Sequence, residues 1–302
     1  MLSAILSLAL LLMLAPLLPG VAARTRSLLT GRRGPPVHQL YIDLWKLMRR
    51  GVVYSETTTP IFRLAPIVVA ATVVIAATLV PLDRTSSVLR FSGDAVAFAY
   101  LLGLGRFLLV LGALDTGSSF EGMGASREVT FASIVELGLF FAIATLAVAT
   151  QELSLSGMLG APLGRHWAQA APSLVMVALG LFSLLLAECA RVPVDDPSTH
   201  LELTMIHEVM VLDHGGPDLA LLLFAGAAKL AVFSALVVAL IVPAPARSLP
   251  VALAILVAGT VGVAIAVGVV ESATARLRLP TVPLYLAGAA ALAGFGLVLV
   301  VR

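Results

Sequence analysis

The sequence has little of what a soluble protein or most cofactor sites require. Only 12% of its 302 residues are charged, whereas 60% are hydrophobic, and the mean hydropathy is +1.05. Such a composition cannot maintain a water-soluble surface. The single cysteine, Cys189, excludes a disulfide framework and an iron–sulfur cluster held by this chain alone. The net charge of +2 is too small to indicate nucleic-acid binding.

Nearly the whole chain is therefore expected to lie in a lipid bilayer. Backbone amides in hydrocarbon must be paired, and the long apolar runs lack the alternation of barrel strands, which leaves α-helices. We predict a single all-α membrane domain over residues 1–302 with about eight transmembrane helices, each of about 20 apolar residues. The predicted spans are Leu2–Ala23, Leu64–Leu82, Ala95–Leu114, Val129–Ala149, Ala171–Cys189, Leu219–Val242, Val251–Val270 and Val282–Val301.

The first span has a second interpretation, because Val21-Ala22-Ala23 resembles a signal-peptide cleavage site. A secretory signal begins with a basic leader, but the first basic residue here is Arg24, after the apolar run. A retained transmembrane helix is therefore favoured over a cleaved signal.

The basic residues predict the orientation. Most of them fall in four segments that share one side of the membrane: Arg24–Arg63, Asp115–Glu128, Ala190–Asp218 and Glu271–Pro280. By the positive-inside rule these segments are cytoplasmic, which places both termini outside. The acidic residues gather on the same side, so the predicted cytoplasmic face suits docking or ion entry.

Two segments outside the spans show the periodicity of short interfacial helices. In Val37–Arg50, apolar residues recur at helical spacing, which predicts an amphipathic helix that is either a membrane-surface connector or a partner-binding element. In Asp195–Asp213, Asp196 before Pro197 resembles a helix N-cap, and Met205, Val209 and Leu212 would share one face.

The second segment is unusually polar, with His200, Glu202, His207 and Glu208. A metal site is disfavoured because two histidines seven residues apart are separated by roughly 10 Å along a helix. We interpret His200 and His207 first as partner contacts; proton exchange by these groups is the alternative, because histidine and crowded glutamate titrate near neutral pH.

Few ionisable residues lie within or at the ends of the spans, and each is expected to face the protein interior and to have a function. They are Arg106, Glu136, Lys229, Glu188 and Glu271. A path from Glu128 or Glu188 through Glu136 toward Lys229 would suit proton transfer. In the alternative, Arg106 and Glu136 form a structural ion pair and Lys229 extends to the membrane surface.

The remaining cofactor classes also lack their ligands. All five histidines lie outside the predicted spans, so a haem-ligand pair is not expected. No phosphate-binding glycine loop is present, and Gly122-Met123-Gly124 is expected to be a tight turn. We predict no catalytic residue, no metal and no cofactor in this chain alone.

The segment VPVDDPSTHLELTMIHE, residues 192–208, resembles the signature loop of the complex I subunit 1 family. Its form is closest to that of the membrane subunits of energy-converting nickel–iron hydrogenases, the formate hydrogenlyase subunit 4 group. GRRGPP with YIDLWKLMRR, FEGMGASRE and ESATARLRLP add to the resemblance, which runs in order along the whole chain.

The resemblance implies a membrane-anchoring, proton-coupling subunit in the cell membrane. Hydrogenase large and small subunits, carrying the nickel–iron site and iron–sulfur clusters, would dock on its cytoplasmic loops, with antiporter-like subunits beside it in the membrane. By motif position, the docking and coupling loop would include Arg191, Asp195, Asp196, Glu202 and Glu208, and the inward path Glu128, Glu136 and Glu188. A complex I subunit with a quinone cavity is the alternative. A free-standing transporter is a third, disfavoured because no inverted repeat is visible.

Overall fold

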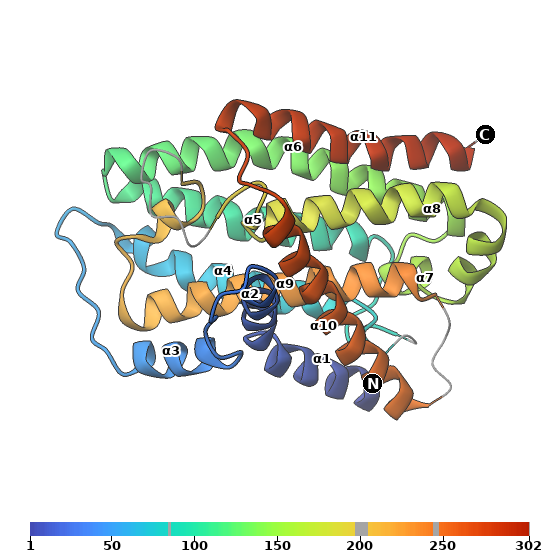
Figure 1. Ribbon diagram of the computed structural model, residues 1–302, viewed down its shortest axis with the longest axis horizontal. Helices are drawn as coiled ribbons and strands as arrows, with labels where there is room; N and C mark the ends of the chain where they lie inside the picture. Colours follow the sequence, from blue (N-terminus) through green and yellow to red (C-terminus); the bar gives the residue numbers. More distant parts are fainter. Residues whose placement is uncertain (84–85, 197–204, 244–247, 302) are drawn as a thin grey trace.

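The computed structural model describes residues 1–83, 86–196, 205–243 and 248–301, and every regular element in that part of the chain is a helix (Figure 1). The elements are α1 (Leu2–Leu14), α2 (Leu17–Leu29), α3 (Gln39–Met48), α4 (Pro60–Leu79), α5 (Asp94–Asp115), α6 (Ser119–Thr150), α7 (Leu155–Met158), α8 (Ala161–Glu188), the 3-10 turn η1 (Glu208–Val211), α9 (Gly216–Ile241), α10 (Leu249–Ala273), the 3-10 turn η2 (Leu279–Thr281) and α11 (Val282–Val301).

Seven of these helices are long and apolar enough to cross a membrane, and the bent pair α1–α2 makes an eighth. The predicted all-α membrane fold is therefore confirmed. The first span is not one continuous helix, however, because α1 and α2 meet at 46°. Pro16 lies at the break, where its ring removes a backbone donor and crowds the preceding turn.

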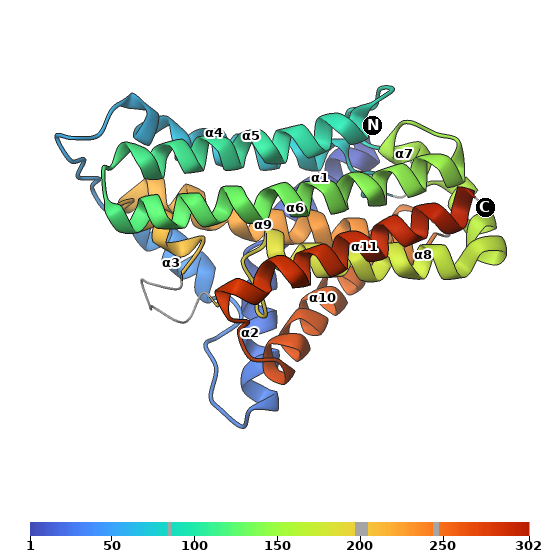
Figure 2. The same ribbon diagram turned by 90° about the horizontal axis from the view of Figure 1, so that it is seen from above.

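The long helices form a bundle with α9 as its most buried member (Figure 1). Helix α4 packs along α5, and α11 packs along both α6 and α8. Figure 2 shows α2 and α10 crossing the direction of the other helices together. Their close approach depends on Gly268, because a Cβ there would lie 2.5 Å from the carbonyl oxygen of Ala22.

Two predictions about local structure were wrong at helix boundaries. Gly122-Met123-Gly124 is not a tight turn but part of α6, which extends ten residues beyond the predicted start of its span at Val129. Helix α8 likewise begins before the predicted Ala171, so His166 lies within it. Its backbone departs from helical geometry at Ala170, just before Pro172. In both cases the helix begins with a segment containing polar residues that precedes the apolar run, and the apolar run alone was used to predict the boundary.

The first predicted amphipathic helix is present as α3. It contacts α2 and α9, has no buried residue, and leaves Trp45 largely exposed. The second, Asp195–Asp213, was wrong over the described residues: 195–196 and 205–207 are not helical, and only Glu208–Val211 forms a 3-10 turn. His200 and Glu202 lie outside the described residues.

Asp195 explains why the second segment does not form the predicted helix. Its carboxylate Oδ2 accepts hydrogen bonds from the backbone N–H groups of Ile206, at 3.2 Å, and His207, at 3.1 Å. Residues eleven and twelve positions apart in one continuous helix would be separated by about 17 Å along its axis, so these contacts are incompatible with the predicted helix. Met205 and Val209, whose apolar spacing suggested a helix face, are both buried.

Candidate functional site

A buried arginine in α5 joins carboxylates from two other helices. Arg106 Nη1 lies 2.6 Å from Glu136 Oε1, and Nη2 donates to Glu188 Oε1. Its Nε lies 3.2 Å from Glu128 Oε1, close enough for an ion pair although not aligned for a hydrogen bond. Helix α6 supplies Glu128 and Glu136 about two turns apart, and Glu188 is the last residue of α8.

Lys229 of α9 completes this cluster. Its Nζ lies 3.3 Å from Glu188 Oε2, so the lysine points to the interior carboxylate. The Arg106 cluster, defined as Arg106, Glu128, Glu136, Glu188 and Lys229, thus contains three acidic and two basic side chains. Glu188 is almost fully buried and Glu136 is 43% exposed, so the carboxylates lead from the interior to an outer face of the chain.

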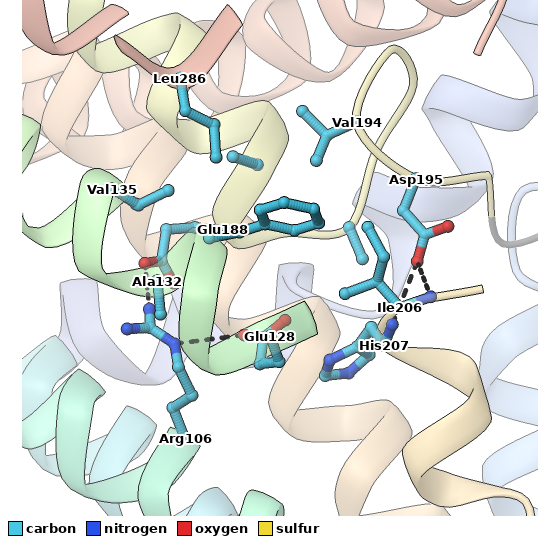
Figure 3. Close-up of a pocket in the computed structure, with 13 residues that line it drawn as sticks. Arg106, Glu128, Ala132, Val135, Glu188, Val194, Asp195, Ile206, His207 and Leu286 are labelled. Carbon is cyan, nitrogen blue, oxygen red and sulfur yellow. Dashed lines mark hydrogen bonds and ion pairs between the residues drawn. The ribbon is translucent and has the colours of Figure 1, made fainter. Parts of the chain in front are cut away.

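The loop after α8 lies against this cluster. Glu128, Glu188, Asp195 and His207 line one pocket together with Arg106 (Figure 3). The His207 side chain faces this pocket. Burial, with a smaller effect of Lys229, lowers the pKa of His207 to about 4, which keeps its ring neutral near pH 7.

Ion pairs fix the same loop to α2, to the end of α10 and to the segment that follows α10. Asp195 Oδ1 lies 2.8 Å from Arg276 Nη2, and Arg191 Nη1 lies 3.4 Å from Glu271 Oε1. Arg26 Nη1 of α2 lies 3.4 Å from Asp196 Oδ1. Arg191 and Asp195, predicted as docking residues, are therefore engaged in contacts within the chain that hold the loop in place.

Glu188 and His207 also line a larger cavity of about 430 Å³. Apolar residues of α2, α3 and α9 line much of it, and its polar lining includes Arg191, Glu208 and Lys229. His214 also lines it; this residue is buried, stacks on Phe62 with ring centroids 3.9 Å apart, and has no hydrogen-bond partner for either ring nitrogen in the described part of the chain.

The sequence did not single out His214 or the pairing of Arg276 with Asp195. Arg276 lies in a conspicuous basic segment, residues 276–278, but nothing local indicates which loop it contacts. Within the described residues no group of histidine, cysteine, aspartate and glutamate side chains is arranged to hold a metal ion.

An apolar helical bundle with charged side chains paired inside it defines a multi-pass membrane protein, and its relatives define the family. Residues 2–301 match the NADH dehydrogenase family, so the chain belongs to the complex I subunit 1 family. It is 33% identical to hydrogenase-4 component C of Escherichia coli K12 over 234 residues, covering 77% of this chain and 72% of that protein.

Two further proteins extend the comparison. The chain is 28% identical to formate hydrogenlyase subunit 4 of Escherichia coli K12 over 277 residues, covering 89% of this chain and 88% of that one. A chain of the archaeal membrane-bound sulfane sulfur reductase, a respiratory membrane complex, shares the fold with a TM-score of 0.84 at 20% identity, covering 99% and 98% of the two chains. The protein is thus a membrane subunit of a multisubunit respiratory complex of the complex I and hydrogenase type.

Proposed function

We propose that this chain is the membrane-anchoring, proton-coupling subunit of an energy-converting nickel–iron hydrogenase complex. The two Escherichia coli relatives favour the hydrogenase branch over the respiratory one. Soluble hydrogenase subunits carrying the metal site and iron–sulfur clusters dock on the cytoplasmic loops, including the segment around Asp196 and residues 197–204. Antiporter-like subunits lie beside the chain in the membrane.

The observation that carries the coupling proposal is the charge balance of the Arg106 cluster. Arg106 pairs with all three carboxylates and Lys229 with one of them, so the cluster has one negative charge in excess when all five groups are ionised. Ionisable groups that follow one another from a buried residue, Glu188, to a partly exposed one, Glu136, supply successive sites for a proton inside the membrane. Protons entering beside His207 and Asp195 would reach Glu188 first and leave through Glu136.

The large cavity favours a second candidate function. A space of about 430 Å³ with apolar walls and a few charged groups suits an amphiphile such as a quinone, which is the alternative expected for a complex I subunit. The reading frames beside this one distinguish the two. A neighbouring large subunit with two pairs of nickel-binding cysteines supports the hydrogenase, and a large subunit without them supports quinone reduction.

Glu136→Gln tests proton coupling. The variant leaves Arg106 with Glu128 and Glu188, so no charge is stranded and the complex is expected to assemble at the normal yield. Loss of the titratable group is expected to abolish most proton-linked turnover. The measurements are complex yield on a native gel and hydrogen-linked activity with a pH probe in vesicles. Full coupling at normal yield would exclude Glu136 from the path, and a low yield would show that Glu136 is needed for assembly.

The proposed orientation predicts opposite labelling of two exposed serines. Ser55 lies in the loop before α4 and Ser92 in the loop before α5. Impermeant maleimide added to intact cells is expected to label Ser92→Cys, whereas Ser55→Cys requires permeabilised cells. Background from the native cysteine is small, because burial raises the pKa of the Cys189 thiol to about 12 and the thiolate is the reactive form. The reverse pattern would invert the proposed topology.

A further inference from the structure

Glu136 presents part of its charge to an outer face of the chain at the depth of the membrane. Its side chain is 43% exposed although Arg106 Nη1 lies 2.6 Å from Oε1. Along α6 it lies about 25 Å from Ser119 and about 21 Å from Thr150. Any placement of a hydrocarbon layer of about 30 Å along this helix of about 48 Å includes the level of Glu136.

Glu136 lies where α6 packs against α5. Gly103 of α5 faces the carboxylate, since a Cβ at this glycine would lie 3.5 Å from Glu136 Oε1. Next to it, Tyr100 of α5 packs edge-on against Phe140 of α6, with ring centroids 6.2 Å apart. Tyr100 is 68% exposed and Phe107, two turns along α5, is 58% exposed, so this face combines large aromatic side chains with one carboxylate.

A carboxylate on such a face cannot be left against lipid without a large desolvation cost, and ionisable groups in membranes accordingly face protein or water. If another protein chain covers this face, the part of the Glu136 carboxylate that is exposed in the isolated chain needs a hydrogen-bond donor from that chain. We propose that the α5–α6 face, defined by Tyr100, Gly103, Phe107, Glu136 and Phe140, binds a transmembrane helix of a neighbouring subunit that donates a hydrogen bond to Glu136.

The aromatic side chains of the α5–α6 face also favour binding of a neighbouring helix. Aromatic side chains are enriched at protein interfaces, and polar side chains form hydrogen bonds between membrane helices. The proposal deepens the proposed function by naming where the neighbouring membrane subunit binds. It rests on assembly into the complex and is independent of proton transfer by Glu136.

Photo-crosslinking in the intact complex tests the contact. Benzoylphenylalanine replaces Tyr100 or, in a second variant that preserves an aromatic side chain, Phe107. Irradiation is expected to join either position to another membrane subunit of the complex, identified by mass spectrometry of the gel-shifted band. Benzoylphenylalanine at Phe295 gives the reference yield of lipid adducts, because this residue is similarly exposed on α11, a helix without charged residues. Lipid adducts only at both α5 positions, or crosslinks to a second copy of this chain, would refute the proposal.

A pair of substitutions at Glu136 tests the chemistry of the contact. Glu136→Gln keeps a hydrogen-bond acceptor, and Glu136→Leu removes it, while both leave Arg106 paired with Glu128 and Glu188. If a donor from another subunit faces this position, the leucine variant gives severalfold less assembled complex than the glutamine variant. If lipid faces it, leucine gives as much complex as the wild type or more, which would overturn the proposal.

The two tests separate this inference from proton coupling. If Glu136→Gln loses coupling and the crosslink to another subunit forms, both the proton path and the α5–α6 interface are supported. If the crosslink to another subunit forms and Glu136→Gln couples fully, only the proton path through Glu136 is refuted. If the crosslink does not form and Glu136→Gln loses coupling, only the proposed interface is refuted.

Discussion

Arg106→Gln is expected to prevent assembly of most of the complex. The substitution leaves three carboxylates of α6 and α8 close together with only Lys229 to offset them, and one of the three, Glu188, is almost fully buried. Removing one partner of a buried ion pair costs about 3–5 kcal/mol in soluble proteins, because the remaining charge is left uncompensated. The measurement is complex yield on a native gel beside total protein in the membrane.

Two controls identify the cause. Arg165→Gln removes an exposed arginine from the start of α8 and is expected to leave the yield unchanged. The double variant Arg106→Gln with Glu128→Gln removes one stranded carboxylate together with the arginine and keeps Glu188 paired with Lys229, so it should restore part of the yield. Normal assembly of Arg106→Gln alone would show that the carboxylates take up protons when the arginine is absent, and that Arg106 does not hold these helices together.

Gly124→Val is expected to displace the loop that carries His207. A Cβ at Gly124 would lie 2.2 Å from Val209 Cγ1 and 3.0 Å from the carbonyl oxygen of Ile206. Overpacking of this kind costs about 1–3 kcal/mol, and the two extra methyl groups of valine place it at the upper end. We expect a lower melting temperature of the purified complex and a severalfold loss of its activity. Gly124→Ala should show the same effects to a smaller extent.

Gly122 is the matched control, because it lies in the same turn of α6 and a Cβ there would meet nothing within 4 Å. Gly122→Ala is expected to be neutral or slightly stabilising, since alanine favours a helix interior by about 1 kcal/mol over glycine. Equal effects of alanine at the two positions would show that the clash at Gly124 does not control the loop.

The sequence by itself determined the membrane class, most of the spans and the family. These properties depend on composition, on runs of about 20 apolar residues and on short motifs, all of which are local along the chain. The amphipathic pattern of residues 37–50 likewise predicted α3 within a few residues. The apolar runs and this one amphipathic pattern were sufficient because each depends on neighbouring residues alone.

Only the tertiary structure decided which distant residues meet. Asp195 binds the backbone of residues 206 and 207, which overrode the helical periodicity of its own segment. The sequence identified Arg106, Glu136 and Lys229 as costly in lipid but did not show that Arg106 contacts three carboxylates or that Lys229 contacts Glu188. These partners come from four helices far apart in sequence, and the packing of whole helices, which no local pattern records, brings them together.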